Sequence, residues 1–188
     1  MARQGTILAR RANDAEQPDS GDNRRRQVLA WIHSHRSPTR GDELAKRFRV
    51  SRQCIVQDVA ILRASGKEII ATPQGYRLPE ASARTHRRVI AATHKPEQTE
   101  EELQILVDHG VKVLDVIVEH PLYGELRGSL MIESRADLKD FLRQVRSTQA
   151  PLLLSLTNGV HLHTVEASRP EMISRATAEL REKGFLLK

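Results

Sequence analysis

The chain has 188 residues, of which 39% are hydrophobic, 29% charged and 3% aromatic, and its formal net charge is +6. This length suits one large domain or two small ones, and the scarcity of aromatic residues means that the cores are built from aliphatic side chains. No apolar run approaches the about 18 residues of a membrane-spanning helix, residues 1–22 lack the apolar centre of a signal peptide, and the single Cys54 excludes an internal disulfide, so we expect a cytoplasmic protein without a membrane span.

The charge is concentrated in the N-terminal half. Residues 23–79 hold 12 Lys and Arg against four acidic residues, a net charge of +8, whereas residues 81–188 hold 15 of each sign. A basic module followed by a neutral one indicates that the first meets a polyanion, although a solvated basic surface without a partner gives the same pattern. Residues 1–22 are polar and of mixed charge, and we expect a disordered tail there.

The basic segment begins with two predicted helices. Asn23 is a candidate N-cap for a helix over residues 24–34, which Ser37 and Pro38 end. A short helix over residues 41–48 follows. Its inward-facing residues are expected to be Leu44, Ala45 and Phe48.

A third helix and a hairpin complete this module. Ser51 is predicted to cap a helix over residues 52–63, and Gly66 is predicted to end it. Residues 67–78 alternate in polarity like a short β-hairpin with its turn at residues 73–75. Three helices and a hairpin are the order of a winged helix-turn-helix, whose third helix enters the major groove of DNA.

Polar and basic residues on the outward side of this module are the candidate DNA contacts. Arg can bond guanine and Gln can bond adenine bidentately, while other basic side chains reach phosphates. The candidates for base contact are Ser51, Arg52, Gln53 and Gln57, and those for phosphate contact are Arg47, Arg49, Lys67 and Arg77. Asp58 is not included, because it can instead hold neighbouring arginines together. A winged helix used only for protein contacts is the alternative interpretation.

The neutral half is predicted to mix strands and helices. After a linker at residues 79–83, the pattern predicts strands at 85–92, 111–118 and 125–132, helices at 96–109, 135–146 and 169–183, and a hairpin of two strands around Asn158 and Gly159 at 151–165. Thr99, followed by Glu102, and Ser134 are candidate N-caps. This order favours an α+β fold, an α/β sandwich with helices on one face of a largely antiparallel sheet.

Two histidines in the last predicted hairpin indicate a metal site. Residues two apart on a strand share a face, so His161 and His163 point into the same space. His94 follows the first strand, and Glu102 lies in the first turns of the helix after it. Three imidazoles and one carboxylate suit a borderline divalent ion such as Zn, Ni or Fe. Two histidines hydrogen-bonded in a polar cleft, with Glu102 as a capping residue, are the alternative.

Both halves resemble known families. The first resembles the biotin-operon-repressor type of helix-turn-helix through Leu44, Ala45, Val50, Ser51, Arg52, Gln53, Ile55, Asp58, Val59, Leu62, Arg63, Gly66, Gly75, Tyr76, Arg77 and Leu78. The second resembles the 3H domain through His94, Glu101, Glu102, Leu103, Val113, Asp115, Val116, Val118, His120, Pro121, Tyr123, Gly124, Ser134, Arg135, Asp137, Pro151, Leu152, Leu156, Thr157, Gly159, His161, Leu162, His163 and Thr164. In this order the two resemble the niacin-responsive transcriptional repressors (NiaR family), over residues 23 to about 185.

That resemblance implies a ligand and a set of contacts. It implies that the C-terminal domain binds nicotinic acid and a transition metal, with the metal on His94, Glu102, His161 and His163. It adds His120, Tyr123 and Arg135 as candidate effector contacts. Arg135 can pair with a carboxylate bidentately, or it can hold Asp137 or Glu133.

The resulting hypothesis is a cytoplasmic homodimer that represses genes of NAD biosynthesis or niacin uptake. It comprises a tail (1–22), a winged helix-turn-helix DNA-binding domain (23–79) and a 3H effector- and metal-binding domain (84–188). Nicotinic acid acts as corepressor, and the dimer reads a palindromic operator in double-stranded DNA. A metal-ion-dependent transcriptional regulator with a different or no organic effector is one alternative. A metalloenzyme fused to a DNA anchor is another, although no nucleophile motif or phosphate loop supports it.

Overall fold

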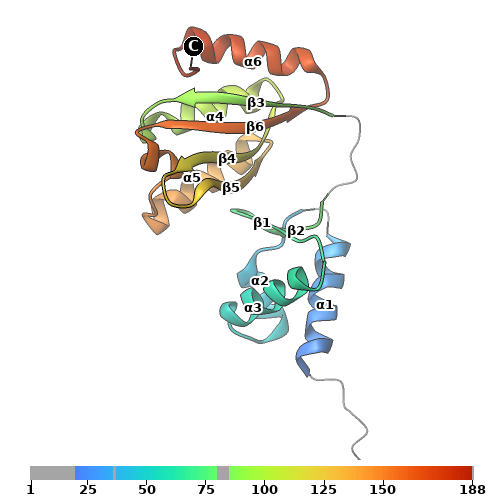
Figure 1. Ribbon diagram of the computed structural model, residues 1–188. Helices are drawn as coiled ribbons and strands as arrows, with labels where there is room; N and C mark the ends of the chain where they lie inside the picture. Colours follow the sequence, from blue (N-terminus) through green and yellow to red (C-terminus); the bar gives the residue numbers. More distant parts are fainter. Residues whose placement is uncertain (1–19, 36, 80–84, 188) are drawn as a thin grey trace, which may run out of the picture.

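The computed structural model describes residues 20–35, 37–79 and 85–187, which form two modules in chain order (Figure 1). The expected tail lies outside this range up to residue 19, but residues 20–22 are helical, so its predicted boundary is too late. Most of the expected linker, residues 80–83, also lies outside the described residues. Across the described ranges, no helix combines the length and the apolar character needed to cross a membrane.

The N-terminal module contains the predicted three helices and hairpin. Its elements are α1 (Ser20–Ser34), α2 (Gly41–Phe48), α3 (Arg52–Ala64), β1 (Ile70–Thr72) and β2 (Gly75–Arg77). The prediction that Ser51 caps α3 is confirmed, since its side chain accepts a hydrogen bond from the Cys54 backbone N–H at 3.1 Å. The prediction for Asn23 is wrong. The helix begins at Ser20, four residues before the predicted start at residue 24, and Asp22 in its first turn suits the positive end of the helix dipole.

One apolar cluster holds this module together. The stripes of α1, α2 and α3 meet in it, together with Ile69 from the start of the hairpin. The buried members are Val28, Ile32, Leu44, Ala45, Ile55, Val59, Leu62 and Ile69. The outward side of α3 is therefore left free of the core.

The C-terminal module is an α+β sandwich, as predicted. Its elements are β3 (His86–Thr93), η1 (Pro96–Gln98), α4 (Thr99–Asp108), β4 (Lys112–His120), β5 (Gly124–Ile132), α5 (Arg135–Thr148), η2 (Leu153–Thr157), β6 (Val160–Ala167) and α6 (Pro170–Glu182). The strand order is β3-β6-β4-β5, and all neighbouring pairs are antiparallel. The three helices pack their apolar sides into one core against the sheet, with α4 and α5 behind it in Figure 1.

The predicted hairpin at residues 151–165 is half wrong. Residues 160–167 form β6, but the segment before the Asn-Gly turn is the 3-10 helix η2 rather than a strand. The reason lies in the sheet order. Because β6 pairs with β3 along one edge and with β4 along the other, it has no edge left for the preceding segment.

The prediction that Thr99 caps α4 is also wrong. The turn η1 continues directly into α4, so Thr99 already has helical backbone angles and cannot act as a cap. The Gln98 side chain instead accepts from the Lys95 backbone N–H at 3.1 Å. Both Thr99 and Glu102 are consequently free to face the module interior. The cap predicted at Ser134 is confirmed, since Ser134 accepts from the Asp137 N–H.

The two modules touch through the hairpin of the first. Strand β1 lies beside β5 (Figure 1). At its turn, the Pro73 carbonyl accepts a hydrogen bond from Gln144 Nε2 of α5 at 2.5 Å. The wing and the last part of α5 are thus in direct contact.

Candidate metal centre and DNA-binding surface

The strand β6 directs His161 and His163 to the helix-covered face of the sheet. Alternate residues of β6 are buried on that face, and these two side chains are 2% and 3% exposed. The prediction that they share one space is confirmed by their ring centroids, which lie 4.8 Å apart. Their neighbours on the other face, such as Leu162, are half-buried.

His94 and Glu102 close the cluster from two other elements. His94 follows β3, the strand beside β6, and Glu102 lies on the inward side of α4. Oε2 of Glu102 is 2.7 Å from Nε2 of His94 and 3.4 and 3.3 Å from those of His161 and His163. The structure therefore gathers the three histidines and the glutamate that the sequence pointed to, and Glu102 itself is fully buried.

The outer nitrogen of each ring is occupied by a backbone carbonyl. Nδ1 of His94, His161 and His163 lies 2.7 to 2.8 Å from the carbonyl oxygens of Lys95, Gly159 and Asp115. A carbonyl only accepts, so each Nδ1 carries the proton, and a neutral ring then turns a bare Nε2 lone pair inward. Backbone carbonyls orient metal-binding histidines in the same way.

The charges of the cluster depend on one another. Burial opposes charging of His94 and His163, but the hydrogen bonds and negative charge of Glu102 outweigh it, so the pKa of each histidine is raised. Burial likewise opposes ionisation of Glu102. The charge of His163 and the hydrogen bonds from all three histidines outweigh it, so its pKa lies well below the usual range. Positive charge on the surrounding histidines therefore stabilises the ionised form of Glu102.

The donor set fits a divalent transition metal. One ligand atom each from His94, Glu102 and His161 lies within 4.8 Å of the others, and His163 approaches the same carboxylate oxygen. The second oxygen of Glu102, Oε1, is buried with no hydrogen-bond partner among the described residues. A carboxylate with one oxygen beside three imidazole nitrogens and the other unpaired matches the nitrogen and oxygen ligands of Zn, Ni or Fe sites.

Gly159 allows the turn before β6 to approach His94. Its φ is +94°, and a Cβ there would lie 2.3 Å from the His94 carbonyl oxygen. Its own carbonyl accepts from the His94 N–H at 3.3 Å and from the ring of His161. A single glycine thus joins two of the histidines through the backbone.

Sequence reasoning did not assign a role to Asp115, which supports His163. A bulge in β4 shifts the strand register between Val113 and Asp115. The Asp115 carboxylate accepts from the Thr164 N–H at 2.9 Å and from Arg127 at 2.7 Å, while its carbonyl binds His163. The sequence did carry a signal for this role, since Asp115 is a carboxylate within an otherwise apolar strand.

A small cavity of about 30 Å³ adjoins the cluster. Its polar lining is Glu102, His161, His163 and Thr99, whose hydroxyl is buried without a hydrogen-bond partner among the described residues. The remaining lining is apolar and comes from α4, the sheet, α5 and η2: Leu103, Val116, Leu130, Phe141, Leu152, Leu153 and Leu154.

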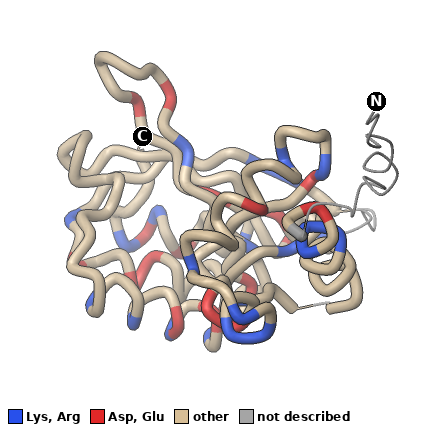
Figure 2. Tube along the Cα trace, turned by 90° about the horizontal axis from the view of Figure 1, so that it is seen from below, with Lys and Arg blue, Asp and Glu red and all other residues tan. Residues whose placement is uncertain are grey.

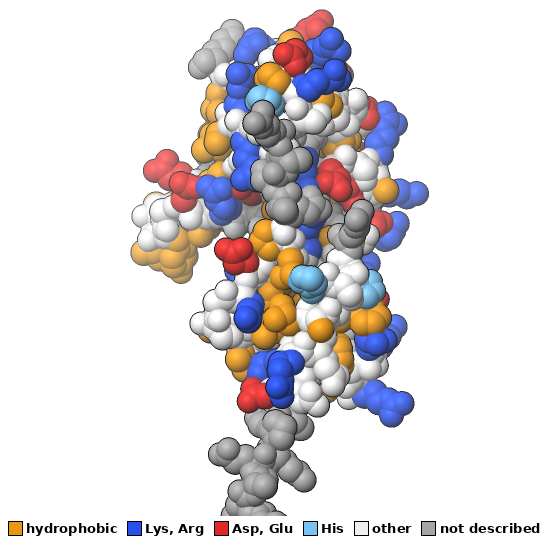
Figure 3. All heavy atoms as spheres, turned by 90° about the vertical axis from the view of Figure 1, so that its right-hand side faces the viewer, with side chains coloured by type: hydrophobic (Ala, Val, Ile, Leu, Met, Phe, Trp, Pro, Cys, Tyr) orange, Lys and Arg blue, Asp and Glu red, His pale blue; other side chains and the backbone are white. Residues whose placement is uncertain are grey.

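The three further effector candidates lie at the surface. The β4–β5 turn projects from the module, and its hydrophobic tip is visible at the left of Figure 3. There His120 stacks on Tyr123, which is 69% exposed. Arg135 makes a two-armed ion pair with Asp108, at 2.6 and 2.7 Å, and not with Asp137 or Glu133, the internal partners that the sequence left open. In the described part of the chain, these contacts do not join any of the three residues to the histidine cluster.

The candidate DNA contacts fall into two groups. Ser51, Arg52, Gln53, Gln57, Arg49 and Lys67 are exposed on the N-terminal module. Arg77, in contrast, is 7% exposed, so its side chain does not face a phosphate in this conformation. Arg47 lies over the Trp31 ring, with 3.6 Å between its guanidinium carbon and the ring centroid. Figure 2 shows that Lys and Arg alternate with acids along the helices of the other module.

The prediction that Asp58 holds arginines together is confirmed. Asp58 is 2% exposed and pairs with Arg24 at 2.6 Å and with Arg25 at 3.6 Å. It therefore links α3 to α1 from inside the module. Arg52, at the start of α3, is paired with Asp42 at 3.2 Å but remains 70% exposed.

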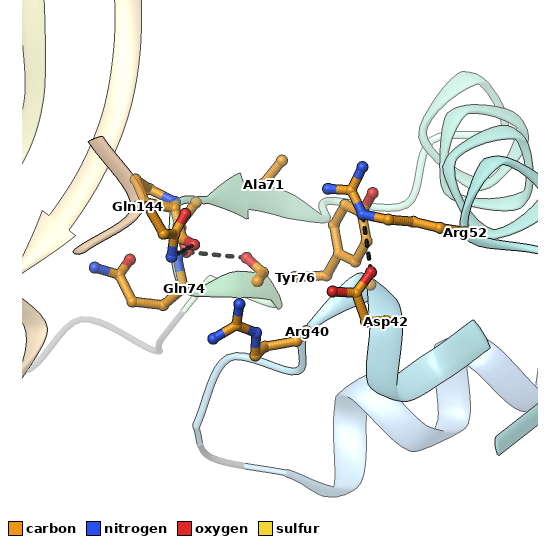
Figure 4. A pocket seen from close by; sticks show the side chains of 11 residues that line it. Arg40, Asp42, Arg52, Ala71, Gln74, Tyr76 and Gln144 are labelled. Carbon is orange, nitrogen blue, oxygen red and sulfur yellow. Dashed lines mark hydrogen bonds and ion pairs between the residues drawn. The ribbon is translucent and has the colours of Figure 1, made fainter. Parts of the chain in front are cut away.

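A second cavity, of about 200 Å³, lies where the modules meet. Figure 4 shows Arg40, Asp42 and Arg52 on one side of it and Gln144 reaching the wing turn on the other. The side-chain amide atoms of Gln74 are buried there without hydrogen-bond partners among the described residues. Arg52 at the start of α3 and Gln144 of α5 therefore line the same cavity beside the wing.

Comparison with known proteins matches both modules. Residues 24–77 match an HTH domain family and residues 87–188 match the 3H domain family. The chain is 47% identical over 171 residues to the transcription repressor NadR of Bacillus subtilis, covering 89% of this chain and 95% of that protein. It is 41% identical over 164 residues to the probable transcription repressor NiaR of Thermotoga maritima, covering 87% and 93% respectively. Both relatives are named as repressors and neither as an enzyme.

Proposed function

Because this chain belongs to the family of 3H-domain transcription repressors that includes those two relatives, we propose that it represses genes of NAD biosynthesis or niacin uptake. Nicotinic acid is the proposed corepressor, bound at a metal-containing C-terminal module. Like these relatives, the chain is a DNA-binding regulator and not an enzyme. We propose that it acts in the cytoplasm, as a homodimer on a palindromic operator, since one winged helix reads few base pairs.

The observation that carries the metal-containing site is the inward set of Nε2 lone pairs around Glu102. His94, His161, His163 and Glu102 would hold the ion, with Zn, Ni and Fe as candidates. A bound ion would supply a fixed positive charge for orienting a small ligand. The backbone carbonyls keep the three rings in one tautomer.

The exposed start of α3 supports the proposed DNA contacts. Arg52, Gln53 and Gln57 lie on the outward side of the helix, and Asp42 restrains the Arg52 side chain. Arg49 and Lys67 are the proposed phosphate contacts. Arg77 is left out because it is buried.

The DNA half of the proposal is tested by operator binding. Arg52→Ala should weaken binding to the operator by about tenfold or more, since a good Arg–guanine pair contributes about 1–3 kcal/mol. Arg63→Ala, at the other end of α3, is the control with the same loss of charge. Equal operator affinity for the two variants would show that Arg52 does not read a base.

The effector half is tested by calorimetric titration of nicotinic acid, with nicotinamide as comparison. We expect binding of the acid to metal-loaded protein and its loss after chelation. For the corepressor role, nicotinic acid must also tighten operator binding, since a ligand shifts an equilibrium only through different affinities for its two states.

A metal-ion-dependent regulator with another or no organic effector is the second candidate. The small size of the cavity beside the cluster favours it, because about 30 Å³ holds little more than one water molecule. Titrating metal alone while following operator binding separates the two. A full response to metal, unchanged by nicotinic acid, would select this second candidate.

A further inference from the structure

One branched apolar side chain, Val56, is exposed in the first half of α3. It is 36% exposed, whereas the inward residues Ile55, Val59 and Leu62 of the same helix are at most 7% exposed. Among the described residues, the apolar cluster of the N-terminal module and the side chains packed against it do not include Val56. Its methyl groups are therefore open to solvent or to a partner.

Valine at this position is unfavourable for the free protein. A β-branched residue has a lowered helix propensity, because the preceding turn restricts its χ1 angle. Burial of the side chain normally offsets that cost, but Val56 remains largely in solvent. Ala, Gln, Lys or Arg would stabilise an exposed helix position better. An apolar partner that covers Val56 on binding would account for the residue.

The surroundings of Val56 suit the major groove of DNA. Arg52 and Gln53 precede it by four and three residues, so both share its side of the helix, and Gln57 follows it directly. All three are exposed. Asp58, the one acidic residue of α3, is buried in an ion pair with α1. The exposed surface of α3 therefore carries no negative side chain of its own, which suits a polyanion.

The methyl group of thymine is the partner that fits Val56. Among the groups that base pairs present in the major groove, this methyl group is the apolar one, while the others donate or accept hydrogen bonds. The stiff χ1 angle of valine in a helix holds its methyl groups in place, so the contact costs little side-chain entropy. Ala60, one turn further along and also exposed, is too small to hold the helix away from the bases.

We propose that Val56 packs against the methyl group of a thymine in the operator and makes that position specific for an A·T pair. The contact rests on the proposed operator binding through α3. Val56 lies one turn after Arg52, in the part of a recognition helix that reaches base edges. Ile61, the other large apolar residue exposed on α3, at 47%, lies more than a turn beyond Val56 and is not part of the contact.

The test removes single methyl groups from the operator. Metal-loaded, full-length protein, with nicotinic acid present, first selects its operator from a random-sequence pool of duplex DNA. Each thymine of that operator is then replaced singly by deoxyuridine, which lacks only the methyl group, and fluorescence anisotropy at one fixed salt concentration measures the affinity. Replacement of the contacted thymine should weaken binding by about fourfold, the effect of burying one methyl-sized group.

Val56→Ala completes a double-mutant cycle with this replacement. The variant should bind the unmodified operator about fourfold more weakly than the wild type, and it should no longer distinguish thymine from deoxyuridine at that position. Its fold is retained, because the position is exposed and alanine is the better helix former. Ile61→Ala is the matched control, which removes an exposed apolar side chain from the same helix and should keep the full discrimination.

The results separate this contact from operator binding itself. If deoxyuridine has the same effect on the wild type and on Val56→Ala at every thymine, the contact is wrong while operator binding stands. A Val56→Ala variant that binds the operator as the wild type does, but changes its oligomeric state in analytical ultracentrifugation, would instead assign Val56 to a protein interface. If the full-length protein selects no sequence, the proposed operator recognition fails, and this contact fails with it.

Discussion

Each imidazole of the cluster has two states that suit different occupants of the centre. With a proton on both nitrogens it donates to Glu102, and with Nε2 bare it can bind a metal. The raised pKa of His94 and of His163 shows how strongly the carboxylate favours the first state when no metal is bound. Protons and metal ions therefore compete for the same nitrogen atoms.

This competition makes the effect of metal on stability depend on pH. Raised histidine pKa values stabilise the metal-free fold below the unfolded value of about 6.5, and that stabilisation is lost as the pH rises through the folded values. Metal affinity increases as the pH rises over the same range, because the metal binds neutral imidazole rings. We expect the increase in Tm on adding metal to be larger at about pH 8 than at about pH 6. At a metal concentration of 100 Kd the increase should reach roughly 10 °C.

Thermal unfolding of chelated and metal-loaded protein across this pH range checks the prediction. Glu102→Gln removes the negative charge that raises both pKa values and also one proposed metal ligand, so the stabilisation of the metal-free fold at low pH should be lost and the metal-induced increase in Tm should be smaller at every pH. A metal-induced shift in Tm that is the same at every pH would contradict the competition.

At the scale of elements, the turn before β6 decides whether the cluster can assemble. Strand β6 lies between β3 and β4, so the backbone that carries His161 and His163 is paired along both of its edges. His94, just beyond β3, reaches them because Gly159 has no side chain. The bulge in β4 then places the Asp115 carbonyl against His163.

Gly159→Ala should lower metal affinity by roughly 10- to 100-fold, the usual effect of disturbing groups that orient metal ligands. Its Cβ would collide with the His94 carbonyl, in addition to the strain of a positive φ. Gly184→Ala is the matched control, because Gly184 has φ +79° but nothing within 4 Å of an added Cβ. Metal titration of both variants measures the collision separately from the strain. Equal losses would show that the close approach to His94 is unimportant.

At the scale of the whole molecule, α5 connects the two modules. Phe141 lines the cavity beside the cluster, and Gln144, one turn later, holds the wing turn through the Pro73 carbonyl. A movement of α5 that opens the cavity would therefore also move the wing.

Gln144→Ala should leave metal and nicotinic acid affinities unchanged while reducing the effect of nicotinic acid on operator affinity. The control is Ser147→Ala, an exposed position on the same helix whose hydroxyl donates to the Gln144 backbone carbonyl of that helix. Operator titrations with and without nicotinic acid give the ratio of the two operator affinities for each protein. A ratio as large in Gln144→Ala as in the wild type would exclude this contact as the connection.

The separate cores of the modules predict two unfolding transitions. Trp31, the single tryptophan, packs against the core of the N-terminal module, so its fluorescence follows that module. Metal should raise the transition seen only by circular dichroism and leave the Trp31 transition nearly unchanged, because no proposed ligand lies in that module. One shared transition that shifts with metal in both signals would mean that the modules unfold as a single unit.

The sequence alone determined what depends on residues close together in the chain. The cap at Ser51 and the stop at Gly66 predicted α3, and alternation along β6 predicted that His161 and His163 share a face. Only the tertiary structure decided which strand edges were taken, and so that residues 153–157 form a 3-10 helix. It also showed that Arg77 is buried, that Arg135 pairs with Asp108, and that Thr99 faces a closed cavity. These outcomes depend on contacts between residues far apart in the chain, whose free energies outweigh local preference and leave no periodic signal.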